Sequence, residues 1–252
     1  ALSVGSNKKY KSNIGPVPGK VKFCKFNDVS HLKKLVNKKT VAIIIEFVQG
    51  DGGINICSKN FAKAIKGICK NKKILLIGDE IQGGIGRTGK IFAYKHYGVN
   101  PDIITSAKGL GSGIPIGATI VKKYISKIIS TGFHGSTFGG GMLQTRVSYN
   151  VFKTINTKRF LNKVLINGNL LSSLIKKMHH LHKDKIVDTR CLGLMAGVEF
   201  KNNQIALKTY EKMSKNGLIS TLIQGKIIRL TPPLIVSSGE IRKAIKIITQ
   251  SL

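Results

Sequence analysis

The chain has 252 residues, 42% of them hydrophobic, and its mean hydropathy of +0.04 excludes a disordered polypeptide and a bundle of membrane-spanning helices. The formal net charge of +31 leaves a basic nucleic-acid-binding protein as one hypothesis. Lysines occur in nearly every segment, however, without an arginine-rich arm, a zinc finger or a ribonucleoprotein pattern, so neither specific nucleic-acid binding nor a membrane partner is expected.

Strands and helices are predicted to alternate in the first half of the chain. Residues 41–48 ("VAIIIEFV") form a short apolar run rich in β-branched side chains, which is typical of a buried parallel strand. A helix is predicted over 60–70, and the run "KILLIGDE" (73–80) is the next strand. Further strands are predicted at "DIITSA" (102–107) and "GATIVKK" (117–123). This order predicts an open α/β sheet with its site at the carboxyl ends of the strands.

The pattern changes after about residue 142. Helices are predicted for 147–155 and 160–181, and strands follow at "KIVDTR" (185–190), "GLMAGVEF" (193–200) and "KIIRLTPPL" (226–234), with helices near 204–216 and from 239. We therefore expect residues 1–155 to belong to a large domain, and residues 156–252 to form a linking helix and a smaller α+β domain.

The stretch "GDEIQGGIGRTGKI" (78–91) matches two phosphate-binding patterns at once. The P-loop pattern fails because Ile91 stands where a Ser or Thr must hold Mg²⁺. The dinucleotide pattern fails because Asp79 and Glu80 put negative charge between the strand and the glycines, where phosphate would approach. Neither nucleotide loop is expected here.

Carboxylates are concentrated in one region of this basic chain. Of the 11 acidic residues, five lie between positions 46 and 102: Glu46, Asp51, Asp79, Glu80 and Asp102. Acidic groups at strand ends are candidates for a functional site.

Cysteines and histidines show no metal-binding spacing. Cys24, Cys57, Cys69 and Cys191 are isolated from one another, which predicts free thiols in a reducing cytoplasm and no metal site. The six histidines include His96 and His134, and we interpret these two as structural residues.

The string "DEIQGGIGRTGKIFAYKHYGVNPDIITSAKGLGSGIPIGA" (79–118) resembles the class III aminotransferases, and among them the acetylornithine aminotransferases. The resemblance extends back through "EFVQGDGGI" (46–54) and forward through "HGSTFGG" (134–140) and "KIIRLTPPL". It implies an α/β protein of the pyridoxal-phosphate-dependent transferase fold type I, with a mainly parallel sheet in the large domain. The implied cofactor is pyridoxal 5'-phosphate.

The resemblance also assigns roles to residues. Lys108 matches the lysine that bonds the coenzyme and then acts as the base that moves a proton. Asp79 matches the carboxylate that keeps the pyridine nitrogen protonated, and Gln82 matches the residue that contacts the ring hydroxyl. Arg229 matches the arginine that binds the substrate carboxylate, and Arg87 is interpreted as a structural residue that ties its loop together.

Two further residues are implied to act across a dimer. Thr137 resembles the residue that reaches the coenzyme phosphate of the neighbouring subunit, and Ser136 resembles one that lies near substrate. A homodimer is therefore expected.

Several positions depart from the family pattern. Phe47 replaces a proline, and Asp51 replaces the glutamate that alternates with the substrate arginine between the two half-reactions, so a shortened reach is expected. The segment "GGGMLQT" (139–145) also departs, at Gly141 and Met142. The opening residues "ALSVGSNKKY" match a stretch well inside the family, so we expect an N-terminally truncated form.

The resemblance implies transfer of the δ-amino group of N-acetylornithine to 2-oxoglutarate in a ping-pong cycle of arginine biosynthesis. It allows succinyldiaminopimelate, in lysine biosynthesis, as a second donor. The alternatives are ornithine or 4-aminobutyrate aminotransferase, and a nucleic-acid-binding protein on a decayed enzyme fold.

Overall fold

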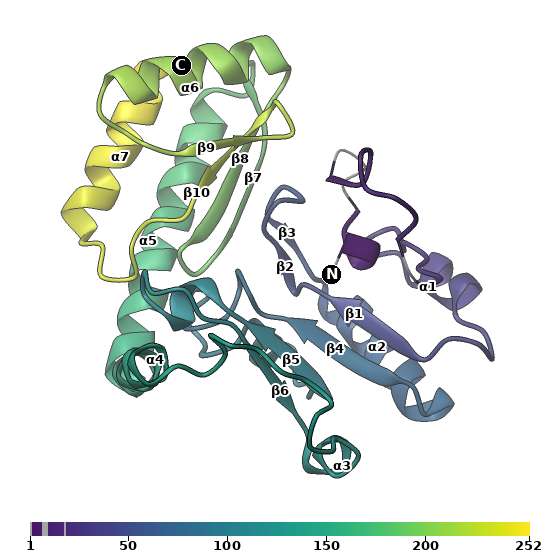
Figure 1. Cartoon of the computed structure of the whole chain (residues 1–252). Helices are drawn as coiled ribbons and strands as arrows, with labels where there is room; N and C mark the ends of the chain where they lie inside the picture. The colour runs from purple at the N-terminus through teal and green to yellow at the C-terminus, as the bar shows by residue number, and fades with distance from the viewer. Residues whose placement is uncertain (1, 7–9, 18) are drawn as a thin grey trace.

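The computed structural model describes residues 2–6, 10–17 and 19–252, and two four-stranded sheets organise them (Figure 1). Residues 1, 7–9 and 18, part of the expected large domain, lie outside the described residues. The helices are α1 (Val29–Leu35), α2 (Lys59–Lys72), α3 (Lys123–Ser126), α4 (Met142–Ile155), α5 (Lys158–Leu181), α6 (Asn203–Lys215) and α7 (Ser238–Ser251). The strands are β1 (Ala42–Ile45), β2 (Val48–Gln49), β3 (Asn55–Ile56), β4 (Leu75–Asp79), β5 (Ile103–Ser106), β6 (Ala118–Val121), β7 (Ile186–Leu192), β8 (Met195–Phe200), β9 (Thr221–Ile223) and β10 (Ile227–Leu230).

The first sheet has the strand order β1-β4-β5-β6, in which β1, β4 and β5 are parallel and β6 is antiparallel. It confirms the mainly parallel sheet predicted from the sequence. Helix α2 covers one face, because Phe61, Ala62, Ile65 and Cys69 form a buried stripe along it. The hydroxyl of Ser58 accepts a hydrogen bond from the Phe61 amide and begins the helix.

The opposite face of the first sheet is partly open. The strand register aligns Ile44, Ile77, Ile103 and Val121 in one row across all four strands. None of these side chains is buried, and Ile44 is 41% exposed. Asp79 lies on this same face, two residues after Ile77, so the open face leads directly to the strand ends.

The second sheet, with the order β7-β8-β10-β9, is antiparallel throughout. Helices α5, α6 and α7 pack against it, and Val198, Phe200 and Ile228 are fully buried between sheet and helices. Ser237 and Glu240 form a capping box that begins α7. The second sheet thus has its own closed core, as expected for the α+β part of the chain.

A short antiparallel hairpin, β2–β3, lies between the two sheets (Figure 1). It interrupts the predicted strand 41–48, because the chain leaves β1 at Glu46 and Phe47 before pairing again at Val48. Phe47, which departs from the family pattern, is buried and stacks on Tyr97 with ring centroids 5.3 Å apart. Within the described residues, no helix combines the length and the apolar character needed to cross a membrane.

Candidate active site

Three strand ends of the first sheet carry ionisable side chains. Glu46 follows β1, Asp79 ends β4 and Lys108 begins the turn after β5. Because β1, β4 and β5 are parallel, their carboxyl ends lie at one edge, as the sequence predicted. The Oδ1 atom of Asp79 accepts hydrogen bonds from the Ile81 amide at 3.0 Å and from the Thr105 hydroxyl at 3.1 Å. These two bonds fix the orientation of the carboxylate.

Lys108 stands in an unusual backbone conformation. Its φ angle is 46°, in the left-handed region that glycine favours, and it opens the 3-10 helix Lys108–Leu110. Ile85 and Ser112 have positive φ angles of 50° and 47°. Residues held in sparsely populated conformations tend to cluster at functional sites, where the surrounding structure enforces them.

Glu46 is a site residue that the sequence analysis did not assign to any role. Burial raises the pKa of its carboxyl, a hydrogen bond from the Gly50 amide at 3.1 Å lowers it, and the charges of Asp79 and Asp51 raise it further. The positive charge of Lys108 acts in the opposite direction. Glu46 thus joins the Asp51 turn, through the Gly50 amide, to the edge at which β4 ends with Asp79 and β5 leads to Lys108. The signal in the sequence that could have identified Glu46 is its position directly after a buried strand, next to the "QGDGG" turn.

Arg229, on β10 of the second sheet, reaches into this neighbourhood. Its Nη1 atom donates to Asp51 Oδ1 at 2.6 Å and to Gln82 Oε1 at 3.2 Å. Burial raises the pKa of Asp51, but hydrogen bonds from Arg229 and Gln82, with the charges of Arg229 and Lys108, prevail and lower it. The shortened reach expected of Asp51 is therefore not observed, because the turn that carries Asp51 lies close to β10.

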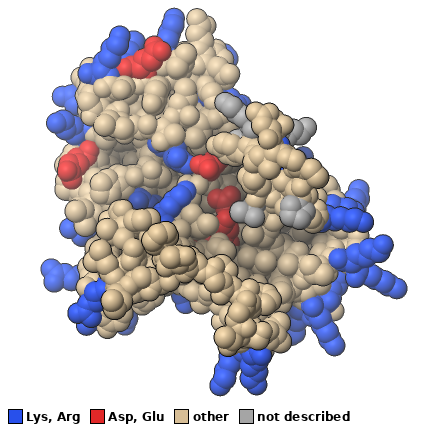
Figure 2. Space-filling view, in the orientation of Figure 1, with Lys and Arg blue, Asp and Glu red and all other residues tan. Residues whose placement is uncertain are grey.

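The Gln82 side chain joins the Asp51 turn to the loop after Asp79. The amide end of this side chain lies against Gly50, where a Cβ atom would force it to move. The amide of Gly50 in turn binds Glu46. Two chain segments and one strand of the second sheet thus converge on the Asp79 edge. Figure 2 shows a central hollow between the two parts of the molecule in which acidic and basic side chains meet.

The remaining basic side chains are distributed differently. In Figure 2 they project from many parts of the molecular outline, whereas acidic side chains are visible in the hollow and at the top and left of this face. This distribution gives no single basic stripe on the visible face that would follow a nucleic-acid backbone.

Ser136 and Thr137 do not join the group. Both lie in the exposed segment 131–140, between α3 and α4. Across the described part of the chain, no hydrogen bond or ion pair connects either side chain to Asp79, Lys108 or Arg229. Their predicted roles therefore remain predictions.

The glycine-rich stretch forms turns behind Asp79 and is not followed by a phosphate-binding helix. Glu80 is fully buried, and its two carboxyl oxygens accept hydrogen bonds from the amides of Ala93, at 2.7 Å, and Tyr94, at 2.8 Å. Burial raises the pKa of Glu80 to about 7, against the lowering effect of those two amides. His96 Nε2 lies 3.1 Å from both oxygens of Thr88, in agreement with a structural role.

Arg87 connects this stretch to the second sheet. Its Nη1 atom donates to the carbonyl oxygens of Leu194, at 3.0 Å, and Pro232, at 2.5 Å. Burial lowers the pKa of the guanidinium to about 10. The resemblance predicts that Arg87 ties its own loop together, but its contacts extend to residues more than 100 positions later in the chain.

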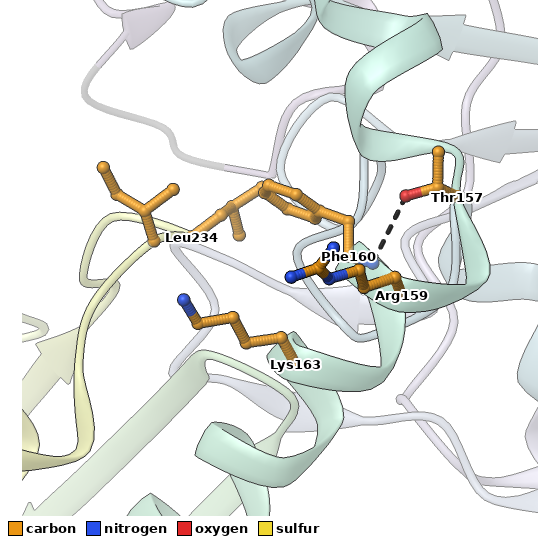
Figure 3. A pocket seen from close by; sticks show the side chains of 6 residues that line it. Thr157, Arg159, Phe160, Lys163 and Leu234 are labelled. Carbon is orange, nitrogen blue, oxygen red and sulfur yellow. Dashed lines mark hydrogen bonds between the residues drawn. The ribbon is translucent and has the colours of Figure 1, made fainter.

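A separate hollow of about 240 Å³ lies near the start of α5 (Figure 3). Arg159 and Lys163 bring positive charge to it, and Phe160 and Leu234 supply apolar surface. Thr157 accepts a hydrogen bond from the Phe160 amide at 3.2 Å. Its lining contains none of the site residues that the sequence predicts at the Asp79 edge.

The chain belongs to the class III aminotransferases, a pyridoxal-phosphate-dependent family, because the family model described as aminotransferase class-III matches residues 1–252. It is 40% identical over 244 residues to an acetylornithine aminotransferase of Methanocaldococcus jannaschii, with 95% of this chain and 60% of that protein aligned. It is 37% identical over 254 residues to ornithine aminotransferase 1 of Staphylococcus saprophyticus, with 100% of this chain and 63% of that protein aligned.

The fold is also similar to those of solved aminotransferase structures. An ornithine aminotransferase from Toxoplasma gondii, with partial occupancy of PLP at its active site, superposes with a TM-score of 0.91 at 28% identity. The match covers 98% of this chain and 58% of that one. The predicted fold type I is confirmed, and the chain spans about 60% of the length of the curated relatives it matches.

Proposed function

We propose that this chain supplies the covalent lysine, the ring-nitrogen partner and the substrate arginine of an enzyme that transfers the δ-amino group of N-acetylornithine to 2-oxoglutarate. The observation that carries the proposal is the contact of Arg229 with Asp51 and Gln82, beside the Asp79 edge. These contacts support a role for Arg229 in binding substrate beside Asp79 and Lys108, which would hold the coenzyme. The proposed pathway is arginine biosynthesis, with succinyldiaminopimelate as a second donor.

The residues at the edge fit pyridoxal phosphate. Both hydrogen bonds that Asp79 accepts from the described residues fall on Oδ1, so Oδ2 would be available to a protonated ring nitrogen. Gln82 would contact the ring hydroxyl, and Lys108 would hold the coenzyme covalently. When bound, the coenzyme supplies an electron sink for the charge that develops on the amino-bearing carbon of the substrate.

Lys108 is the proposed base. Its amine, once released from the coenzyme, takes the proton from the amino-bearing carbon and later returns a proton, so one group serves both directions of transfer. The carboxyl groups of Glu46 and Asp51 lie near this amine, and the positive charge of Lys108 lowers the pKa of both.

Arg229 and Asp51 together allow two different substrates at one site. The side chain of Asp51 is 77% exposed and can turn into solvent, whereas that of Arg229 is only 17% exposed and stays in place. A carboxylate of 2-oxoglutarate would displace Asp51 and form a bidentate pair with the guanidinium. Arg229 Nε is buried without a hydrogen-bond partner among the described residues, so the guanidinium is not saturated by the present contacts.

We further propose a homodimer in which Ser136 and Thr137 serve the neighbouring site, Thr137 by binding the coenzyme phosphate. Their loop exposes large apolar side chains: Phe133 is 74% exposed and Phe138 87% exposed. Clustered apolar exposure of this kind is typical of an interaction surface.

The amino donor is tested directly in the full-length protein supplied with pyridoxal phosphate. Glutamate formation from 2-oxoglutarate should be most efficient, measured as kcat/KM, with N-acetylornithine, and weaker with ornithine or 4-aminobutyrate. Ornithine is the main alternative, since one of the similar relatives is an ornithine aminotransferase. A preference for ornithine would replace the proposed donor but keep the reaction class, and no amino transfer from any of the three would contradict both.

A further inference from the structure

The position of Asp51 is set by its backbone. Its side chain is 77% exposed, so packing around the carboxylate does not hold it in place. The ion pair with Arg229 forms only because residues 50–54, the turn between β2 and β3, lie close to β10. Whatever holds this turn therefore decides whether Asp51 reaches the substrate arginine.

The turn has a conformation that needs support. Ile54, its last residue, has a φ angle of 58°, although a β-branched residue is disfavoured in that region. The Ile54 side chain is fully buried with Val48 and Met195, and its amide donates to the Gln49 carbonyl at 2.9 Å. Such a conformation persists only where neighbouring contacts enforce it.

Arg190, on β7 of the second sheet, supplies those contacts. Its Nη1 atom donates to the carbonyl of Gly53 and to Asn55 Oδ1, both at 2.7 Å. On the other side, Nε donates to Asp188 at 2.7 Å and Nη2 pairs with Glu199. The guanidinium thus divides its fork between its own sheet and the Asp51 turn, a task that its fixed planar geometry suits.

Asn55 extends this restraint toward Asp51. While its Oδ1 atom accepts from Arg190, its Nδ2 atom donates to the Gly52 carbonyl at 2.7 Å and to Gln49 Oε1 at 3.0 Å. The carbonyl groups of both residues that follow Asp51 therefore accept hydrogen bonds: that of Gly52 from Asn55, and that of Gly53 from Arg190.

The restraint places Asp51 and Arg229 on one platform. Strand β8, which carries Glu199, pairs with β10 so that Arg229 lies opposite Gly197. A Cβ atom at Gly53 would lie 2.8 Å from Ile227 Cδ1, so the turn also packs directly on β10. Arg190 joins the turn to the sheet that carries the substrate arginine.

We propose that Arg190 is a positioning residue that holds the Asp51 turn within reach of Arg229 and so controls how readily Arg229 accepts the carboxylate of a 2-oxo dicarboxylic acid. The inference depends on the proposed function for its kinetic consequence only. The restraint of the turn is a property of the fold, and it is measurable without activity.

Hydrogen exchange of the same protein preparation that is used for kinetics tests the restraint. In Arg190→Gln, exchange of the Ile54 amide should become at least about tenfold faster, while amides of α7 keep their rates. Arg190→Lys should lie between parent and Gln variant, and Asn55→Ala should show the same local change with the arginine intact. Lys226→Gln is the matched control, because Lys226 pairs with Glu199 at 2.8 Å but does not contact the turn.

Kinetics of the full-length enzyme test the consequence. We expect Arg190→Gln to change the KM for 2-oxoglutarate by about tenfold while the half-reaction with the amino donor changes less than threefold, and Arg190→Lys to recover part of the change. Unchanged exchange at Ile54 in both Arg190→Gln and Asn55→Ala would overturn the inference, whatever the donor. Faster exchange with equal changes in both half-reactions would overturn the kinetic role, and absence of any amino transfer would instead count against the proposed function.

Discussion

The two four-stranded sheets differ in how completely the rest of the described chain covers their faces. The second sheet buries Val198, Phe200 and Ile228 fully beneath α5, α6 and α7. The first sheet leaves the row from Ile44 to Val121 partly open on one face. The closed sheet contributes Arg229, whereas the open one carries Asp79 and Lys108 at its strand ends. Both sheets therefore have a buried core but differ in how far their second face is open, and the following predictions test that contrast from the largest expected effect to the smallest.

The first prediction concerns the chemical role of the first sheet. In the full-length protein, Lys108→Ala should lower kcat by at least about 10⁴-fold, because covalent attachment and proton transfer both depend on one amine. Turnover and the absorbance of lysine-bound coenzyme would be measured together. Lys63→Ala, at an exposed position of α2, is the control and should behave as the parent. Near-normal turnover of Lys108→Ala would contradict a role for Lys108, and hence for this end of the first sheet, in the chemical step.

The second prediction concerns packing. Ile248 is fully buried in the core of the second sheet. Ile248→Ala should lower the free energy of unfolding by about 2 to 5 kcal/mol. Ile44→Ala, on the open face of the first sheet, should cost less than about 1.5 kcal/mol, since much of that side chain is already in water. Urea unfolding of both variants under identical conditions gives the comparison. Equal losses would show that the first sheet's open face is covered in solution.

The third prediction uses the buried carboxyl at the end of the first sheet. The pKa of Glu80 is about 7 in the fold, against an ordinary value of 4.5, because burial disfavours the charged form. The folded protein therefore keeps a proton that the unfolded chain releases, so this contribution to stability is complete below pH 4.5 and is lost as the pH rises to 7. The loss amounts to roughly 3 kcal/mol at most.

Glu80→Gln should flatten this dependence between pH 5 and pH 8, as measured by urea midpoints at several pH values. Glu211→Gln, at an exposed position of α6, should leave the slope as in the parent. If Glu80→Gln keeps the same slope of urea midpoint against pH as the parent, another group is responsible for the pH dependence.

The fourth prediction concerns the contribution of the second sheet to substrate selection. Arg229→Lys should raise the KM for 2-oxoglutarate by about tenfold, because an ammonium group cannot form the bidentate pair with a carboxylate. The fold and the bound coenzyme should be unaffected. Arg242→Lys, at an exposed position of α7, is the matched control. A lower kcat at unchanged KM would indicate that Arg229 acts in the chemical step.

Sequence patterns predicted the strong local elements well. The apolar run before Asp79 and the stripe on α2 were sufficient for β4 and its neighbouring helix, because burial on one or both faces leaves a clear period. Strand β9 and the hairpin β2–β3 were not predicted, since strands of two or three residues carry too little pattern. The sequence also could not show that β6 runs antiparallel to β5, because strand direction depends on pairing.

By itself, the sequence determined that Asp79 and Lys108 lie at strand ends. Each of the two residues comes directly after its own buried apolar run, and such a run is visible in the sequence. Only the tertiary structure decided which distant groups meet them. The contact of Asp51 with Arg229 joins positions 178 residues apart, and the turn that carries Asp51 is hydrogen-bonded to Arg190 of the second sheet. Such contacts are set by the docking of two sheets, and neither composition nor periodicity records where one sheet comes to lie against another.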